Sequence, residues 1–324
     1  MDRIPSIPTI DLGHFLASRG AEQRSLAAEV DDVCATLGFL IVENHGVPHT
    51  VIDRLWTSSR AFFDLPLEQK MRSRSPDPQC PRGYFPFAAE ALAQSLGVET
   101  PPDIKESFGI GPLRAPKGAM SDDATSFHYG ANLWPDQPEM FRDHLTAYHT
   151  ELEALGSRVL SLFAAALELP LDYFEQFHGS PMCALRCLSY PPNKGELSPG
   201  QRGAGEHADY GSITMLKSDP NVAGLEIRLP TGAWISAPLV EDGFIVNIGD
   251  MMARWTNDRW VSTLHRVTSP GDVQRQSIAF FHNASFDALI ECIPTCRDAR
   301  GGAKYEPIYA GEYLWQRFTS ALAG

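Results

Sequence analysis

The pattern of hydrophobic and polar positions along this chain changes near its middle. In the first half, apolar residues recur at three- and four-residue steps, which predicts helices over about 21–37 and 50–63 and one long amphipathic helix over 137–169. Gly38 follows the first of these helices, at the position where a glycine commonly ends one. A short β-like run at 39–42 separates the first two helices. The first half is therefore predicted to be mainly helical.

The second half, from about residue 182, is predicted to be rich in β-strands. Its apolar runs are short and are separated by Gly, Pro, Asn and Asp, a pattern typical of a sandwich or barrel. The predicted strands are 184–190, 212–217, 224–229, 243–248, 265–268 and 276–281. Helices in the first half and strands in the second favour an α+β class in which both halves share one core.

Residues 73–135 fit neither pattern. They are rich in Pro, Gly and Asp, and their apolar positions follow no clear period. A long irregular segment in a compact enzyme is often part of a binding site. We therefore expect this segment to be irregular and to contribute a lid over a site.

Composition narrows the classes of protein to consider. The 324 residues, 43% of them hydrophobic, can bury a substantial core, and we find no run of about 18 apolar residues that could span a membrane. The N-terminal residues lack the apolar core of a signal peptide, and six dispersed cysteines lack the density of a disulfide scaffold. We therefore expect reduced thiols and a cytoplasmic location. A net charge of −13 without a Lys/Arg cluster argues against nucleic acid as a partner, while the oligomeric state stays open.

The most informative residues lie in the segment 205–211. His207 and Asp209 are two positions apart, so on a strand both side chains point to the same face. His265, at the start of a predicted strand, is the best candidate for a third ligand. Two imidazoles and one carboxylate on one side of a metal ion form the facial site that Fe(II) oxygenases prefer. The sequence therefore predicts a metal site at His207, Asp209 and His265.

A second pair supports this interpretation. Arg275 and Ser277 share one face of another predicted strand. A guanidinium group and a hydroxyl group together suit a carboxylate. Beside a ferrous ion they would hold the distal carboxylate of a 2-oxo diacid whose 2-oxo acid end chelates the metal.

Several short motifs occur in a defined order along nearly the whole chain. The sequence resembles the isopenicillin N synthase-like branch of the 2-oxoglutarate- and Fe(II)-dependent dioxygenases. The motifs that carry the resemblance are I-P-x-I-D-L at 7–12, G-F-x-x-x-x-N-H-G-V at 38–47, R-G-Y at 82–84, Y-P-P at 190–192, H-x-D at 207–209, N-I-G-D at 247–250, H-R-V at 265–267 and R-x-S at 275–277.

The resemblance implies a fold and a cofactor. It implies a distorted double-stranded β-helix (jelly-roll) core over 182–324, a helix and strand region over 1–135, and a long supporting helix with its continuation over 136–181, all in one compact unit. It also implies that Tyr190 binds the distal carboxylate of 2-oxoglutarate together with the arginine and serine of R-x-S. Leu188 departs from the family, because plant members that bind 2-oxoglutarate often have Asn there.

The reaction implied by the resemblance is oxidation of a small molecule, most often hydroxylation, with release of succinate and CO2. Fe(II) is the cofactor, 2-oxoglutarate and O2 are the co-substrates, and ascorbate is a candidate reductant. Strand parity places Phe281 on the face of R-x-S, and Arg186 and Leu188 on the face of Tyr190. These three residues, with Tyr84 and Phe85 from the irregular segment, are the candidate substrate pocket. Burial in the core is the alternative for each aromatic ring, and a structural acid is the alternative partner for Arg186.

Three other functions compete with this interpretation. Some family members are oxidases that do not use 2-oxoglutarate and carry out desaturation or ring closure. A zinc hydrolase could use the same three ligands, but it leaves R-x-S without a purpose. A non-catalytic binding protein could keep the fold, although all three ligands are present.

Overall fold

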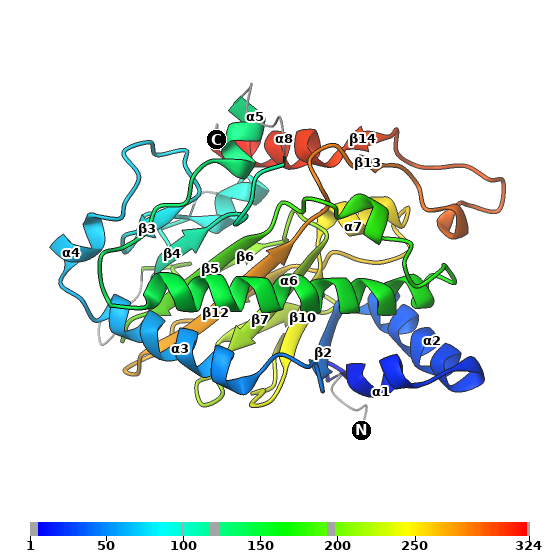
Figure 1. Cartoon of the computed structure of the whole chain (residues 1–324), viewed down its shortest axis with the longest axis horizontal. Coiled ribbons are helices and arrows are strands. Elements are labelled where there is room, and N and C mark those ends of the chain that lie inside the picture. Colours follow the sequence, from blue (N-terminus) through cyan, green and yellow to red (C-terminus); the bar gives the residue numbers. More distant parts are fainter. Residues whose placement is uncertain (1–5, 99, 117–122, 193–197, 323–324) are drawn as a thin grey trace.

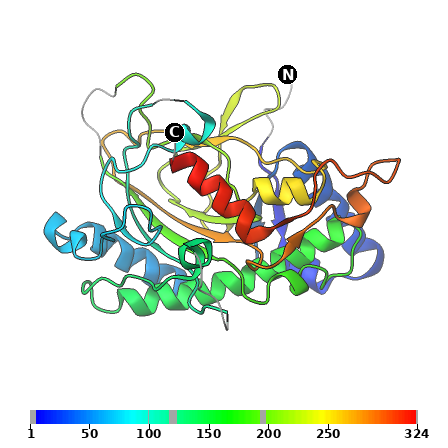
Figure 2. The same cartoon turned by 90° about the horizontal axis from the view of Figure 1, so that it is seen from above.

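Two β-sheets face each other in the computed structural model, which describes residues 6–98, 100–116, 123–192 and 198–322 (Figures 1 and 2). Within these residues, the larger sheet has eight strands and the smaller sheet has four. The larger sheet contains, in spatial order, β1 (Thr9–Asp11), β2 (Phe39–Glu43), β10 (Phe244–Ile248), β7 (Ile213–Ser218), β12 (Arg275–His282), β5 (Ala184–Tyr190), β4 (Glu106–Ile110) and β3 (Gly83–Phe85). The smaller sheet contains β6 (Ala204–His207), β11 (His265–Val267), β8 (Leu225–Arg228) and β9 (Trp234–Ser236).

Helices cover the outer face of the larger sheet, where the long helix α6 crosses the strands (Figure 1). The helices of the described ranges are α1 (Leu12–Ala17), α2 (Gly20–Thr36), α3 (His49–Phe63), α4 (Leu67–Met71), α5 (Asp123–Tyr129), α6 (Phe141–Ala166), α7 (Asp250–Trp255) and α8 (Ala310–Leu322), with 3₁₀ turns η1 (Leu92–Leu96), η2 (Glu175–Phe177) and η3 (Pro294–Cys296). A small separate pair joins β13 (Leu289–Ile290) to β14 (Ile308–Tyr309).

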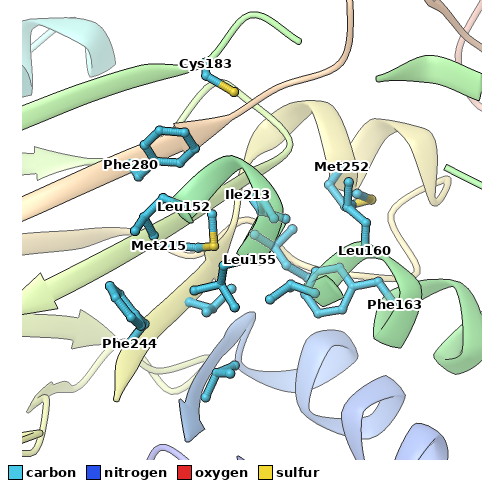
Figure 3. Close-up of a cluster of buried hydrophobic side chains, with 14 of the residues drawn as sticks. Leu152, Leu155, Leu160, Phe163, Cys183, Ile213, Met215, Phe244, Met252 and Phe280 are labelled. Carbon is cyan, nitrogen blue, oxygen red and sulfur yellow. The ribbon is translucent and has the colours of Figure 1, made fainter. Parts of the chain in front are cut away.

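The main hydrophobic core lies between α6 and the outer face of the larger sheet. Leu152 and Leu155 of α6 gather there with Met215 of β7 and Phe280 of β12 (Figure 3). All four side chains are fully buried. The three- and four-residue spacing of the apolar positions on α6 explains this packing, because it places them on one side of the helix.

A second hydrophobic cluster fills part of the space between the two sheets. It joins Tyr190 and Ile245 of the larger sheet to Leu225, Ile227 and Val267 of the smaller sheet. The strands therefore contribute alternate residues to two different environments, since successive side chains point to opposite faces. This second space is where the candidate site lies.

The predicted helices and most predicted strands are confirmed, with ends that differ by a few residues. The expectation that residues 73–135 are irregular is wrong in part, because β3 and β4 lie in this segment and extend the larger sheet beside β5. Their pairing partner is distant in sequence, so local composition gave no sign of it. Residues 99 and 117–122 of the predicted lid lie outside the described residues, as do residues 1–5 of the N-terminal segment.

Two expectations about composition can also be compared with the structure. All six cysteines are free thiols, as the sequence predicted. None of the helices in the described part of the chain is long and apolar enough to cross a membrane.

Candidate active site

Three side chains from two neighbouring strands and a turn converge between the sheets. β6 ends at His207 and pairs with β11, so that His207 lies directly opposite His265. The two imidazole ring centres are 4.3 Å apart, and Nε2 of His265 is 3.9 Å from Oδ1 of Asp209. One nitrogen or oxygen from each of the three residues lies within 4.8 Å of the others, and no other such group was found among the described residues.

One detail of the predicted geometry is wrong. Asp209 does not share a strand face with His207, because β6 ends at the histidine and the aspartate follows in a turn. The turn is held by backbone hydrogen bonds from Asp250 and Met251, at the start of α7, to residues 209–211. This turn, and not the alternation of side chains along a strand, brings the carboxylate of Asp209 close to the two imidazoles.

Hydrogen bonds fix which ring nitrogen of each histidine is free. Nδ1 of His207 lies 2.8 Å from the carbonyl oxygen of Gly205, and Nδ1 of His265 lies 3.1 Å from that of Thr263. A carbonyl oxygen can only accept, so each Nδ1 carries the hydrogen and each Nε2 keeps a free lone pair. Metal-binding histidines in proteins are oriented in this way.

The carboxylate of Asp209 is oriented by two donors. Its Oδ2 accepts hydrogen bonds from Oγ1 of Thr214 at 2.5 Å and from Nδ2 of Asn247 at 2.7 Å. Oδ1, the atom nearest to His265, receives no hydrogen bond from another described side chain. This arrangement leaves one carboxylate oxygen for a metal ion and uses the other to hold the group in place.

The charge states also suit a divalent cation. Burial, followed by the nearby His265, lowers the pKa of His207 to about 3, so its ring is neutral at pH 7. Burial by itself would raise the pKa of Asp209, but the two imidazoles and the two hydrogen bonds hold it below the usual value. A neutral imidazole and an ionised carboxylate are the forms that bind metals.

A buried arginine with unused hydrogen-bond donors lies on the inner face of the larger sheet, the face that is turned towards the smaller sheet. Arg275 is 1% exposed, and its Nη2 donates to Oγ of Ser218 at 3.1 Å. Its Nε and Nη1 have no hydrogen-bond partner among the described residues, and its guanidinium carbon lies 4.9 Å from the ring centre of Tyr190. Ser277, 2% exposed, follows on the same face of β12. Because a buried guanidinium with two free donors is costly, this group is built to receive an anion.

Four of the five candidate pocket residues share this face. In the pairing of β5 with β12, Leu188 lies opposite Ser277 and Arg186 lies opposite Ala279, while Phe281 pairs with Thr214 of β7. Phe85 of β3 joins them, with its ring 4.6 Å from the guanidinium carbon of Arg186. All four are partly exposed, whereas their neighbours on the outer face are buried, so solvent reaches the space in front of them.

Tyr84 does not belong to this group. It pairs with Phe108 and points to the outer face, where its ring lies 5.9 Å from that of Phe62. Its hydroxyl donates to Oε2 of Glu106 at 2.5 Å, and its side chain is buried. The prediction of Tyr84 as a pocket residue is wrong, because neighbouring residues on a strand cannot face the same side.

Arg186 has a structural acid as its partner. Its Nη1 donates to Oε1 of Glu90 at 2.8 Å, and both side chains are about one-fifth exposed. Glu90 also lies 3.5 Å from Nζ of the buried Lys105. The guanidinium group of Arg186 therefore lies between this acid and the ring of Phe85.

Two family models match separate parts of the chain. The model for the N-terminal part of non-haem dioxygenases in morphine synthesis matches residues 7–137, and the model of the 2OG-Fe(II) oxygenase superfamily matches residues 180–284. Homoarginine-6-hydroxylase 2-ODD-233 of Oryza sativa subsp. japonica is 33% identical over 293 residues, which are 89% of this chain and 87% of that protein. The chain belongs to the 2OG-Fe(II) oxygenase superfamily.

Other relatives show how far the likeness extends. Validamycin A dioxygenase of Streptomyces hygroscopicus subsp. limoneus is 30% identical over 96% of this chain and 86% of its own length. The solved structure of a full-length Neurospora crassa protein in complex with alpha-KG has a TM-score of 0.86 and 33% identity, covering 99% of this chain and 98% of that one. The α+β class with a jelly-roll core is thereby confirmed. This oxygenase requires Fe(II) and 2-oxoglutarate and oxidises a small molecule.

Some residues around the site escaped the sequence analysis. Thr214 lies in an ordinary strand, and Asn247 stands in the N-I-G-D motif, to which the sequence gave no role at the metal site, yet both donate to Asp209. Glu90, Asp103 and Lys105 lie in the Pro- and Gly-rich segment, which has no helical or strand period to orient them. For the inner face of β5, the sequence offered two signals, the tyrosine–proline motif and the alternation of side chains along the strand.

Proposed function

We propose that this oxygenase hydroxylates a small molecule at an Fe(II) ion held by His207, Asp209 and His265. The ligand set supports this proposal, because two imidazoles and one carboxylate on one side leave other coordination positions open for substrates. When bound, the ferrous ion supplies the oxidative chemistry with O2 and 2-oxoglutarate, giving succinate and CO2. The protein's own part is to orient the reacting C–H bond and exclude water.

The single observation that carries the co-substrate assignment is the pair of unused nitrogens on Arg275. Nε and Nη1 are buried and have no partner among the described residues, on the inner face of the larger sheet next to Tyr190. A distal carboxylate of 2-oxoglutarate would satisfy both, with Ser277 and Tyr190 as further contacts on the same face. Because this family requires 2-oxoglutarate, the distal carboxylate of this co-substrate is a suitable partner for these donors. The donors are present although Leu188 stands where plant members often have Asn.

For the substrate, the proposal is limited to the chemistry of the pocket. Phe281, Leu188 and Phe85 offer apolar surface, and Arg186 offers hydrogen-bond donors. They suit a molecule with a flat or apolar body and an anionic or carbonyl group. Ascorbate as reductant, a cytoplasmic location, and the lack of nucleic-acid and membrane partners stay predictions from the sequence.

The test is an anaerobic titration of the apo-protein with Fe(II) and then with 2-oxoglutarate. The visible charge-transfer band of the chelate is expected in the wild type and not in His207→Ala. A band in the wild type alone would support the site and justify a substrate screen by succinate release. Iron binding without a band would contradict the role of Arg275, and a band of normal strength in His207→Ala would contradict the ligand assignment.

A further inference from the structure

The strand that carries His207 lies at the edge of the smaller sheet. β6 pairs with β11 on one side only. Its other side is covered by η1 and by residues 102–105, where N–H of Ile104 donates to the carbonyl of Arg202 at 2.8 Å. Buried N–H groups on a strand edge need an acceptor, since an unpaired one costs free energy. For Gly205, this acceptor is a side chain.

Asp103 takes the place of a neighbouring strand. Its Oδ1 accepts the N–H of Gly205 at 2.8 Å, and its Oδ2 accepts the N–H of Leu92 at 3.1 Å. The aspartate is 2% exposed. A β-carbon at Gly205 would come within 3.0 Å of Ala93 in η1, so the strand and the covering turn are in direct contact. Asp103 thus ties the metal-binding strand to the segment over the site.

The same glycine also holds the imidazole. Asp103 accepts the N–H of Gly205, and the carbonyl oxygen of Gly205 accepts Nδ1–H of His207 at 2.8 Å. The position of this carbonyl determines the orientation of the ring and where Nε2 points. Groups that hydrogen-bond directly to a metal-binding histidine, as this carbonyl does, typically affect metal affinity or activity by about 10- to 100-fold.

A chain of alternating charges runs from Asp103 to the proposed pocket. Nζ of Lys105 donates to Oδ2 of Asp103 at 2.7 Å and lies 3.5 Å from Oε2 of Glu90. Glu90 in turn accepts from Arg186. The lysine and aspartate side chains are each 2% exposed. Buried charges of this kind are retained only when paired, so each member of the chain depends on its neighbours.

We propose that Asp103 is a positioning residue that couples the metal ligand His207 to the substrate-facing pair of Glu90 and Arg186. This inference rests on the proposed function, because it takes His207 as a metal ligand and Arg186 as part of the pocket. A purely structural carboxylate would affect stability alone. A positioning carboxylate also affects the metal site and the covering segment.

The experiment compares Asp103→Ala and Asp103→Asn with Glu106→Ala as a matched control. Glu106 is also a largely buried carboxylate of this segment, with 12% of its side chain exposed, but it points to the outer face and pairs with Lys70 at 2.7 Å. Fe(II) dissociation constants are measured anaerobically, and amide hydrogen exchange is followed in the full-length apo-protein over residues 202–207. Thermal unfolding of each variant reports any general loss of stability.

We expect Asp103→Ala to weaken Fe(II) binding by up to about 10-fold, the lower end of the range for direct partners, because Asp103 acts on His207 through Gly205, and to speed exchange over 202–207. Asp103→Asn keeps one acceptor oxygen and should fall between this variant and the wild type. Glu106→Ala should lower stability but leave Fe(II) affinity and exchange over 202–207 unchanged. Equal Fe(II) affinities in Asp103→Ala and Glu106→Ala would overturn the proposal.

Lys105→Met tests the second half of the coupling. It keeps both groups of the Asp103–Gly205 hydrogen bond and removes the ammonium group that joins Asp103 to Glu90. We expect faster exchange over residues 86–92 and a smaller loss of Fe(II) affinity than in Asp103→Ala. An equal loss would contradict the assignment of the metal effect to Asp103. The exchange measurements need no bound metal, so they remain decisive even if the wild type failed to form the 2-oxoglutarate chelate.

Discussion

The two faces of the larger sheet are built from the same strands but serve different ends. On β7, Met215 faces outward into the core under α6, while the adjacent Thr214 faces inward and donates to Asp209. On β12, Phe280 faces outward and Phe281 inward. The outer face is mainly apolar and largely buried under the helices, with polar residues such as Glu106 towards one edge, whereas the inner face carries Arg275 and other polar groups beside solvent-accessible positions.

The alternation of side chains along a strand therefore places residues that stabilise the fold on one face of the sheet and residues that serve the site on the other. Outer residues are surrounded by other apolar atoms, so their removal creates cavities. Inner residues are placed by hydrogen bonds, so their removal alters ligand affinity with little effect on packing. Substitutions one position apart on a strand should therefore have different consequences, and five predictions test this in order of decreasing expected effect.

The largest effect is expected for Asp209, a proposed metal ligand in the space that the inner face of the larger sheet borders. Asp209→Ala removes the only carboxylate of the metal-binding group, so Fe(II) affinity should fall by more than the about 100-fold upper range of indirect partners. Anaerobic titration with Fe(II) and 2-oxoglutarate should show no charge-transfer band. Asp258→Ala, which removes a partly exposed carboxylate paired with Lys304, is the control. A normal charge-transfer band in Asp209→Ala would contradict the assignment of Asp209 as a metal ligand.

On the outer face, Phe280→Ala should lower the free energy of unfolding by about 3–5 kcal/mol, the range for deletion of a buried aromatic ring. Phe280 is fully buried in the core of Figure 3. Urea unfolding measures the loss, and Fe(II) affinity is measured on the folded protein. Since the ring points away from the site, a large loss of Fe(II) affinity would show that the two faces are not independent.

Arg275→Ala should weaken 2-oxoglutarate binding by about 2–5 kcal/mol, the usual cost of truncating one partner of a buried charge pair. Fe(II) binding in the absence of 2-oxoglutarate should remain close to that of the wild type. Arg158→Ala, which removes a guanidinium that binds the carbonyl of His45 away from this face, serves as the control. Unchanged affinity for 2-oxoglutarate in Arg275→Ala would contradict the co-substrate site.

Thr214→Val removes one of the two donors to Asp209, and Asn247 keeps the other. Fe(II) affinity should fall by about 10-fold, the lower end for such partners. Met215→Leu, one position along and on the opposite face, conserves volume and should leave Fe(II) affinity unchanged. Similar Fe(II) affinities in Thr214→Val and Met215→Leu would contradict the proposed difference between these adjacent residues.

The smallest expected effect concerns pH and the outer face. Burial lowers the pKa of His149 to about 4. The ring, 1% exposed, has no hydrogen-bond partner among the described residues, and its Nδ1 lies 3.6 Å from Oε2 of Glu153. The unfolded chain binds this proton at a higher pH than the native state does. Stability is therefore lost as pH falls from the ordinary histidine pKa near 6.5 towards 4.

His149→Leu should reduce this acid sensitivity. Between pH 7 and 5.5 the apo-variant should lose about 1 kcal/mol less stability than the wild type, as measured by urea unfolding at both values. Buried His178 and His282 keep part of the dependence in both proteins, because burial lowers their pKa values as well. Identical pH dependence in the two proteins would exclude a contribution from His149.

Much of the candidate site could be predicted because ligand chemistry is written in residue types. His207, Asp209 and His265 stand in short motifs, and Arg275 and Ser277 share a face through the period of two. The same parity placed Arg186, Leu188 and Phe281 correctly on the inner face. It was not applied to Tyr84 and Phe85, because the Pro- and Gly-rich segment gave no sign of a strand, and Tyr84 was misplaced as a result.

The sequence by itself determined the helices, most strands, the metal-binding residue types and the family of this oxygenase. These features depend on local periodicity and on the order of short motifs. Only the tertiary structure decided that β3 and β4 complete the larger sheet, that Asn247 and Thr214 orient Asp209, and that Asp103 supports the strand of His207. Such contacts join residues far apart in the chain, and local patterns carry no information about which distant group satisfies a buried hydrogen bond.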